Sequence, residues 1–322
     1  MSALIAVTGS TGFVGESLTR ELASREFKVR AVVRAGNPTT DRSDSNIDII
    51  SVGEINPQAA WSGALTGVDC VIHCAARAHV MHETSGNALA AYRSVNVEGS
   101  RRLAEQAAAS GVRRLVYLSS IKVNGEQTAL GAPFIFSDTS APEDAYGISK
   151  WEAEQALWDI SAKTGLEVVV VRPPLVYGPG VKGNLARLLK LVRSGLPLPL
   201  GAVQNRRSLI GLDNLVDLLI RCVDHPAAAG QTFLVADGED LSTLDLLRHM
   251  AAAMGRTARL LPVPVPLLRF AGSALGKRAE IDRLVGSLQI DSNHTRQVLG
   301  WTPPVSVEEG IRRMVQGSSG AG

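Results

Sequence analysis

The feature that most constrains this chain is a glycine-rich turn near its beginning, Thr8-Gly9-Ser10-Thr11-Gly12-Phe13-Val14-Gly15. An apolar run typical of a buried strand, Leu4–Thr8, leads into the turn, and a predicted helix, Glu16–Ser24, follows it. Glycine lets the backbone adopt open dihedral angles and approach a ligand closely, and the N–H groups at the helix start favour a phosphate. The turn therefore predicts a pyrophosphate site, although bare glycine-rich turns also occur in many folds. Its predicted cofactor-binding residues are Gly9, Ser10, Thr11, Gly12, Phe13, Val14 and Gly15.

The first two-thirds of the chain alternates short apolar runs with amphipathic stretches. The runs are typical of strands buried on both faces of a parallel sheet: Leu4–Thr8, Val29–Val33, Ile47–Val52, Cys70–Cys74, Leu115–Ser119 and Val168–Arg172. Helices are predicted between them, among them Glu16–Ser24, Val97–Ala109 and Tyr146–Thr164. This alternation predicts an α/β fold with a Rossmann-type doubly wound parallel sheet.

The alternation loosens after Arg172, where several prolines break the chain into turns around one predicted helix, Asn184–Ser194. A helix over Asp213–Val223, a strand over Thr232–Ala236 and a helix capped by Ser242 follow. We therefore expect a dinucleotide-binding domain over residues 1–172 that also receives 211–236. Residues 173–210 and 237–322 are expected to form a smaller C-terminal α/β substrate-binding domain.

Charge and hydropathy exclude several kinds of partner. The formal net charge is only +2, which argues against a nucleic-acid or anionic membrane surface as partner. The most apolar stretch, 260–275, is interrupted by prolines and an arginine and falls short of the ~20 apolar residues of a spanning helix. No basic and apolar leader opens the chain. Three cysteines, an odd number, predict no disulfide framework, so we expect a cytoplasmic protein.

A metal site is one hypothesis, because His73, His79 and His82 lie close together in the sequence, with Cys70 and Cys74 nearby. The cysteines alternate within an apolar run, and no second pair of ligands stands at zinc spacing. We therefore predict that these residues are structural and that the protein has no metal ligands.

The predicted chemical centre begins with Tyr146-Gly147-Ile148-Ser149-Lys150, which places a phenol and an ammonium on one face of a helix. A neighbouring ammonium and an oxidised nicotinamide ring would lower the pKa of the phenol and allow it to move a proton. Ser120 follows a predicted strand, at the sheet edge where α/β sites form, and can hydrogen-bond the reacting oxygen. We predict Ser120, Tyr146 and Lys150 as catalytic residues, with Tyr146 and Lys150 also touching the cofactor.

The end of the second strand bears on the choice between NAD and NADP. A carboxylate there would bind the ribose 2′-hydroxyl of NAD, whereas an arginine can pair with the 2′-phosphate of NADP. This chain has Arg34 and no acid at that position. The prediction is therefore NADP or NAD, with NADP favoured; an ordinary surface arginine is the alternative.

Taken together, these motifs resemble an extended short-chain dehydrogenase/reductase of the NAD(P)-dependent nucleotide-sugar epimerase/dehydratase family. The likeness runs from Thr8 to about Trp301, and the segment 119–126 resembles the bacterial O-antigen and UDP-N-acetyl-amino-sugar branch. It implies further cofactor contacts at Ala75, Ala76, Asn96 and Pro173. It implies nucleotide diphosphate contacts at Asn184 and Arg207, while Lys122, beside the catalytic serine, is either a phosphate contact or a solvated charge.

The resemblance implies hydride transfer at C4 of a nucleotide sugar, in one of two forms. A dehydratase usually has an Asp-Glu pair after the central hydroxyl residue, where this chain has Ile121 and Lys122. Because Arg34 favours NADPH, we expect a 4-keto-reductase of a UDP-4-keto-6-deoxy-N-acetylhexosamine in O-antigen sugar biosynthesis. A UDP-sugar 4-epimerase of the UDP-GlcNAc or UDP-Glc type, with bound NAD, is the alternative.

Two further hypotheses concern catalysis and assembly. A non-catalytic NADP-binding sensor is a second alternative, but such relatives usually lose the tyrosine or the lysine that this chain retains. Helices Val97–Ala109 and Tyr146–Thr164 correspond to those that form a four-helix bundle in dimeric relatives, so a homodimer is expected.

Overall fold

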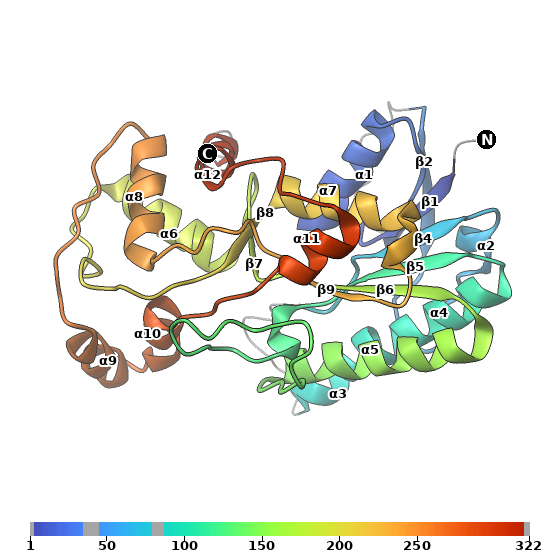
Figure 1. The fold of residues 1–322 in the computed structure, drawn as a ribbon, viewed down its shortest axis with the longest axis horizontal. Helices are drawn as coiled ribbons and strands as arrows, with labels where there is room; N and C mark the ends of the chain where they lie inside the picture. Colours follow the sequence, from blue (N-terminus) through green and yellow to red (C-terminus); the bar gives the residue numbers. More distant parts are fainter. Residues whose placement is uncertain (1–2, 35–44, 79–86, 319–322) are drawn as a thin grey trace.

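The computed structural model describes residues 3–34, 45–78 and 87–318. Its central element is a parallel sheet of seven strands in the order β3-β2-β1-β4-β5-β6-β9 (Figure 1). The bounds of these strands are β1 Leu4–Thr8, β2 Lys28–Arg34, β3 Ile47–Val52, β4 Cys70–His73, β5 Arg114–Leu118, β6 Glu167–Arg172 and β9 Thr232–Leu234. The strand order reverses between β1 and β4, and ligands of open α/β sheets bind at the carboxyl edge beside such a reversal.

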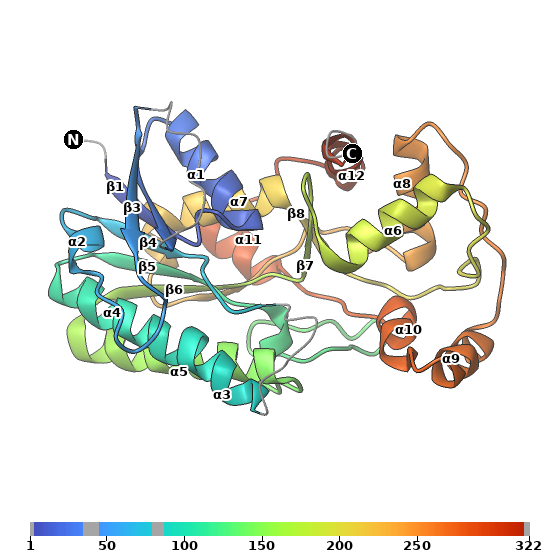
Figure 2. The same ribbon diagram turned by 180° about the vertical axis from the view of Figure 1, so that it is seen from behind.

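Helices cover both faces of the sheet, as the near-continuous apolar strands require (Figures 1 and 2). α1 (Phe13–Ser24) and α7 (Leu212–Asp224) pack against each other on one face. α4 (Ser100–Ala109) and α5 (Ala145–Thr164) pack together on the other. The shorter elements of this half are α2 Ser62–Leu65, α3 Ala88–Tyr92, η1 Arg93–Gly99, η2 Ile121–Val123 and η3 Pro226–Ala228.

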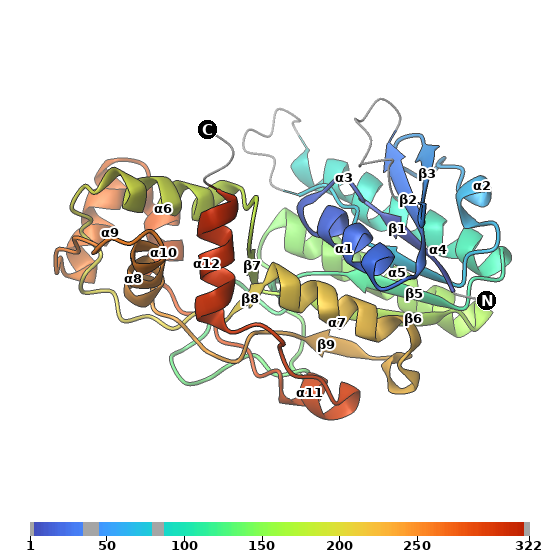
Figure 3. The same ribbon diagram turned by 90° about the horizontal axis from the view of Figure 1, so that it is seen from above.

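A second lobe lies beyond the carboxyl edge of the sheet and has a core of its own (Figures 1 and 3). A two-stranded parallel sheet of β7 (Leu175–Tyr177) and β8 (Leu209–Gly211) lies between this lobe and the large sheet. The remaining helices are α6 Gly183–Ser194, α8 Thr243–Ala253, α9 Val265–Ala274, α10 Arg278–Val285, α11 Asn293–Leu299 and α12 Val307–Gly317. The loop between η2 and α5 reaches this lobe, because Phe134 pairs with Ile290 through a β-bridge.

The predicted elements agree with the structure to within a few residues, with one physical difference. The helix predicted over Val97–Ala109 is divided into a π-helical segment, η1, and the regular helix α4. Gly99 lies where the two meet, and a Cβ there would lie 2.6 Å from a side-chain carbon of Ile55. This contact joins segments far apart in the chain, so the hydropathy pattern could not predict it. Within the described part of the chain, no helix combines the length and the apolar character that crossing a bilayer requires.

Candidate active site

The glycine-rich turn has the shape that a phosphate site requires. Gly9 adopts a φ of +69°, and a Cβ at Gly15 would lie 2.1 Å from the carbonyl oxygen of Gly9. Helix α1 has Gly12 as its N-cap residue and no side-chain cap, so side chains do not cover its first N–H groups. An uncapped helix start beside a tight glycine turn fits a dinucleotide pyrophosphate.

The other residues of the turn divide between the core and the exposed side. Ser10 is fully buried and donates to the carbonyl of Val32 at 3.0 Å, so its side chain ties the turn to β2. Phe13 and Val14 pack partly against the apolar core under α1, whereas Thr11 is exposed. Backbone groups rather than the Ser10 hydroxyl are therefore the groups available to a phosphate.

The loop after β4 approaches the turn closely. A Cβ at Gly9 would lie 2.8 Å from the backbone nitrogen of Ala75, and Ala75 and Ala76 are both half-buried. His73 anchors the strand end, with Nδ1 2.6 Å from Thr8 Oγ1 and Nε2 2.9 Å from Ser100 Oγ. Burial lowers the pKa of His73 to about 3, so the ring is neutral and serves as a structural link.

Of the three histidines of the predicted cluster, His79 and His82 lie outside the described residues. Both ring nitrogens of His73 are already within hydrogen-bond distance of hydroxyl groups. Over 3–34, 45–78 and 87–318, no group of three or more His, Cys, Asp or Glu side chains is arranged to hold a metal ion.

Asn96 joins this loop to the helix that carries the tyrosine. Its side chain, 1% exposed, accepts from the N–H of Arg77 at 2.8 Å and donates to the Ser149 hydroxyl at 2.9 Å. The asparagine therefore holds two segments together at the sheet edge. Its side chain makes these hydrogen bonds within the protein.

Tyr146 and Lys150 lie on the first two turns of α5, one helical turn apart. Lys150 is 1% exposed, donates to the carbonyl of Leu118 at 2.6 Å and lies 4.1 Å from the centre of the Tyr117 ring. Burial lowers the pKa of Lys150 to about 7. The lysine thus ties α5 to the end of β5, beside Ser120.

The pKa of the Tyr146 phenol is shifted in the direction opposite to the one expected from the sequence. Burial raises its pKa, and the charge of Asp144 and the neighbouring Tyr92 raise it further. Tyr92 meets the phenol ring edge-on, with 6.1 Å between the ring centres. Lys150 does not lower the pKa of Tyr146 here, because burial disfavours the charged forms of both side chains.

Ser120 caps the short 3-10 turn η2, and its hydroxyl accepts from the N–H of Lys122 at 3.3 Å. The next residue, Ile121, donates its N–H to the carbonyl of the buried Pro173 at 3.0 Å, and η2 packs against α5. The structure therefore brings the ends of β5 and β6 and the start of α5 together, with Ser120, Pro173, Tyr146 and Lys150 at one edge.

Lys122 forms ion pairs in this structure. Its ammonium donates to Glu126 at 2.7 Å and to Asp144, which is the N-cap of α5. The side chain is 30% exposed, and its contact with a substrate phosphate stays a prediction.

The sequence analysis did not predict a buried ion pair that lies next to Ser119. Glu154 is 0% exposed and binds Arg172 at 2.5 and 3.0 Å, and the Ser119 hydroxyl also donates to it. Arg172 further donates to Asn124 at 2.9 Å. A signal was present, because Glu154 follows Lys150 by four residues and so shares a face of α5 with it.

The remaining predicted residues lie on other elements. Arg34 is the exposed last residue of β2. Asn184 is exposed at the start of α6. Arg207 donates to the carbonyls of Arg283 and Gly286 at 3.0 and 3.1 Å, so it caps the C-terminal end of α10.

Comparison with known proteins identifies a family, two relatives and a similar solved structure. The model of the NAD dependent epimerase/dehydratase family matches residues 5–236. A UDP-glucose 4-epimerase of Vibrio cholerae is 46% identical over 97% of this chain and 94% of its own length. An N-acetyl-alpha-D-glucosaminyl-diphospho-ditrans,octacis-undecaprenol 4-epimerase of Escherichia coli O157:H7 is 25% identical over the same shares. Among solved structures, a UDP-glucuronic acid 4-epimerase of Bacillus cereus in complex with NAD matches with a TM-score of 0.78. It is 19% identical and the match covers 98% of this chain and 99% of that one, a likeness of fold.

Proposed function

Because the chain belongs to the NAD dependent epimerase/dehydratase family, we propose that it is a UDP-sugar 4-epimerase of the UDP-GlcNAc or UDP-Glc type. The coarser assignment is an NAD(P)-dependent enzyme that acts on a nucleotide sugar. The observation that carries the proposal is the convergence of Ser120, Tyr146 and Lys150 at the carboxyl edge, beside the glycine turn. The 46% identity to a UDP-glucose 4-epimerase supports the finer assignment over the expected reductase.

Each residue has a role that follows from its contacts. Gly9, Gly12 and Gly15 would hold the pyrophosphate against the start of α1, with Ala75 and Ala76 beside it. When bound, the nicotinamide supplies hydride exchange with C4. Tyr146 moves the proton of the C4 hydroxyl and Ser120 hydrogen-bonds the same oxygen. Lys150 supplies positive charge near the phenol, and a cationic pyridine ring would counteract the effect of burial on the phenol.

A 4-keto-reductase that uses NADPH is the second candidate, and Arg34 is the observation that favours it. The residue stands, exposed, at the end of β2 where a carboxylate would otherwise accept from the NAD ribose. Arg34→Asp is expected to shift the ratio of Michaelis constants toward NAD if this arginine pairs with a 2′-phosphate. If the ratio of Michaelis constants does not change, Arg34 is an ordinary surface residue. It then gives no reason to prefer the reductase over the epimerase.

The deciding experiment offers two substrates separately. UDP-N-acetylglucosamine or UDP-glucose is incubated without added reductant, and formation of the 4-epimer is followed by NMR. The UDP-4-keto-6-deoxy sugar is incubated with NADPH, and loss of NADPH absorbance is followed. Epimer formation supports the proposal; NADPH consumption with the second substrate only would replace it with the reductase.

A Tyr146→Phe variant tests the chemical centre itself. Loss of a general acid–base group lowers the rate by about 10²–10⁴-fold. Turnover that is unaffected in this variant, with either substrate, would contradict the role of Tyr146 in both candidates. Wild-type protein that binds NAD(P) but turns over neither substrate would instead favour the non-catalytic sensor.

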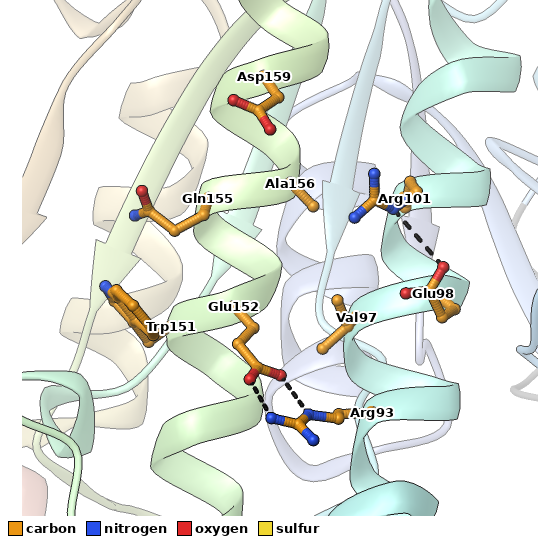
Figure 4. A pocket seen from close by; sticks show the side chains of 9 residues that line it. All are labelled: Arg93, Val97, Glu98, Arg101, Trp151, Glu152, Gln155, Ala156 and Asp159. Carbon is orange, nitrogen blue, oxygen red and sulfur yellow. Dashed lines mark hydrogen bonds and ion pairs between the residues drawn. The ribbon is translucent and has the colours of Figure 1, made fainter.

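We also propose a homodimer through the outer face of η1, α4 and α5. Figure 4 shows a hollow on this face between the helices, with Arg93 paired to Glu152 and with Trp151 alongside. Trp151 is 37% exposed, and the family resemblance noted in the sequence implies that these helices pair in a dimer. Trp151→Glu is expected to yield monomers in light scattering, whereas Leu191→Glu, at the 42% exposed Leu191 of α6, should not.

The domain division remains a proposal as well. β9 extends the large sheet beside β6, and α7 packs on it, which supports assigning 211–236 to the dinucleotide-binding half. The separate core of the second lobe supports a substrate-binding half formed by 173–210 and most of 237–322. Helix α11 is the exception, because it packs against β9 and η3, and Leu299 and Trp301 belong to the core under the large sheet.

A further inference from the structure

Lys122 stands between the serine turn and the helix that carries the tyrosine. It lies two residues after Ser120, and its ammonium donates both to Glu126 at 2.7 Å and to Asp144. The Lys122 side chain is 30% exposed, so solvent screens this cluster only in part. The backbone of Lys122 also lies close to α5, because a Cβ at Gly147 would lie 2.8 Å from the carbonyl oxygen of Lys122.

Asp144 divides its two carboxylate oxygens between two tasks. Oδ1 accepts from the N–H of Gly147 at 2.6 Å and so caps α5, while Oδ2 takes the Lys122 ammonium. A carboxylate is a good N-cap because it accepts an N–H bond and complements the helix dipole. Here the cap lies two residues before Tyr146, whose phenol must carry negative charge when it acts as a base. An uncompensated carboxylate at this place would oppose that charge.

We propose that Lys122 is a positioning residue that neutralises the Asp144 carboxylate, so that Asp144 caps the catalytic helix without preventing the Tyr146 phenol from losing its proton. The inference rests on the proposed role of Tyr146 in proton transfer. Lys122 touches neither the reacting atoms nor the phenol, and it acts through Asp144.

Other charges face this cluster and define what the test must separate. Glu126 shares the ammonium and lies near enough to Arg207 to raise the pKa of that guanidinium, although burial of Arg207 has the larger, opposite effect. Glu143 accepts from the N–H of Glu126 at 3.4 Å. On the far side of the phenol, Tyr92 packs edge-on and lies under the guanidinium of Arg77. Lys150 lies one turn along α5.

The experiment measures titration rather than turnover. The chain has four tyrosines, so ¹³Cζ-labelled tyrosine gives a simple spectrum in which Tyr146→Phe identifies the Tyr146 signal. In the NAD⁺-loaded protein, Lys122→Met is expected to raise the pKa of Tyr146 by about one unit. Lys122→Arg, which keeps the charge, should leave it at the wild-type value.

The double variant Lys122→Met/Asp144→Asn separates charge from packing. Asparagine still caps a helix but has no charge, so the double variant should return the Tyr146 titration to that of wild type. A Tyr146 titration that stays unchanged in Lys122→Met, or that stays raised in the double variant, would overturn the proposal. In cofactor-free protein, Lys122→Met should also raise the pKa of the Asp144 carboxyl, followed by ¹³Cγ NMR; no change there would overturn it too.

Activity profiles distinguish this inference from the proposed function. If both hold, the pH profile of kcat shifts with the Tyr146 titration in each variant. If the titration shifts as expected but activity does not follow it, Lys122 has the inferred effect on the phenol and the phenol is not the proton-transfer group. That outcome contradicts the proposed function and supports the electrostatic link.

Discussion

The cofactor side and the substrate side of the candidate site are built from different kinds of contact. On the cofactor side, Lys150 and Asn96 are both 1% exposed and donate to groups on other elements. On the substrate side, Asn184 is exposed and Arg207 holds the end of α10. Buried, mutually satisfied polar groups fix a geometry before any ligand arrives. The contrast indicates that the predicted chemical centre is preorganised, whereas the geometry of the predicted substrate contacts depends on how the second lobe is held.

The strongest test of preorganisation removes the charge of Glu154. Glu154→Gln leaves Arg172 buried without its counter-ion, and breaking a buried pair in this way costs about 3–5 kcal/mol. Urea unfolding measures the loss. Glu152→Gln is the matched control on the same helix, because its pair with Arg93 is partly exposed and should contribute less than about 1 kcal/mol. Equal losses in the two variants would contradict a specially rigid centre.

A methyl group added to the glycine turn tests the same side at the phosphate site. Gly15→Ala places a Cβ 2.1 Å from the Gly9 carbonyl oxygen, so the turn must shift, at a cost of about 3 kcal/mol. NAD(P) binding, followed by fluorescence, should be lost with it. Gly53→Ala is the control, since a Cβ there meets no atom within 4 Å. Normal cofactor affinity in Gly15→Ala would mean that the turn is not the pyrophosphate site.

Arg207 carries the test to the substrate side. Arg207→Met removes two hydrogen bonds from a charged donor to backbone carbonyls, a loss of about 2 kcal/mol in the free energy of unfolding. The exposed neighbour Arg206 supplies the control variant, Arg206→Met, which should be close to neutral. A raised KM for the nucleotide sugar without a stability loss would instead make Arg207 a diphosphate ligand and weaken the contrast between the two sides.

The smallest effect, taken per pH unit, is a pH dependence of stability measured without added cofactor. The pKa of Lys150 is about 7 in the folded chain, against about 10.4 when unfolded. Between these values the unfolded chain binds more protons, so the free energy of unfolding rises with pH, by at most about 1.4 kcal/mol per unit. Lys150→Met should flatten this slope, whereas Lys28→Met, at an exposed lysine of β2, should preserve it.

An unchanged slope in Lys150→Met would carry its own meaning. The Leu118 carbonyl and the Tyr117 ring face would then be keeping Lys150 protonated throughout this pH range. In that case the cofactor side would be more polar than its burial indicates.

The sequence by itself determined the sheet and the glycine turn, and it predicted the residues of the chemical centre. These depend on local patterns, because apolar runs mark buried strands and a four-residue spacing aligns Tyr146 with Lys150 on one helix face. The family assignment followed from the same motifs, and the family match over 5–236 confirmed it. The finer choice of a reductase rested on Arg34 and on the likeness of segment 119–126 to the O-antigen and amino-sugar branch, and the comparisons favour the epimerase instead.

Only the tertiary structure decided how the charged residues are used. Lys122 is paired with Asp144 across 22 positions and Arg207 with the Arg283 carbonyl across 76, and neither pairing leaves a periodic trace in the sequence. A charge is placed by the partners that compensate it, and the fold alone determines which partners lie within reach.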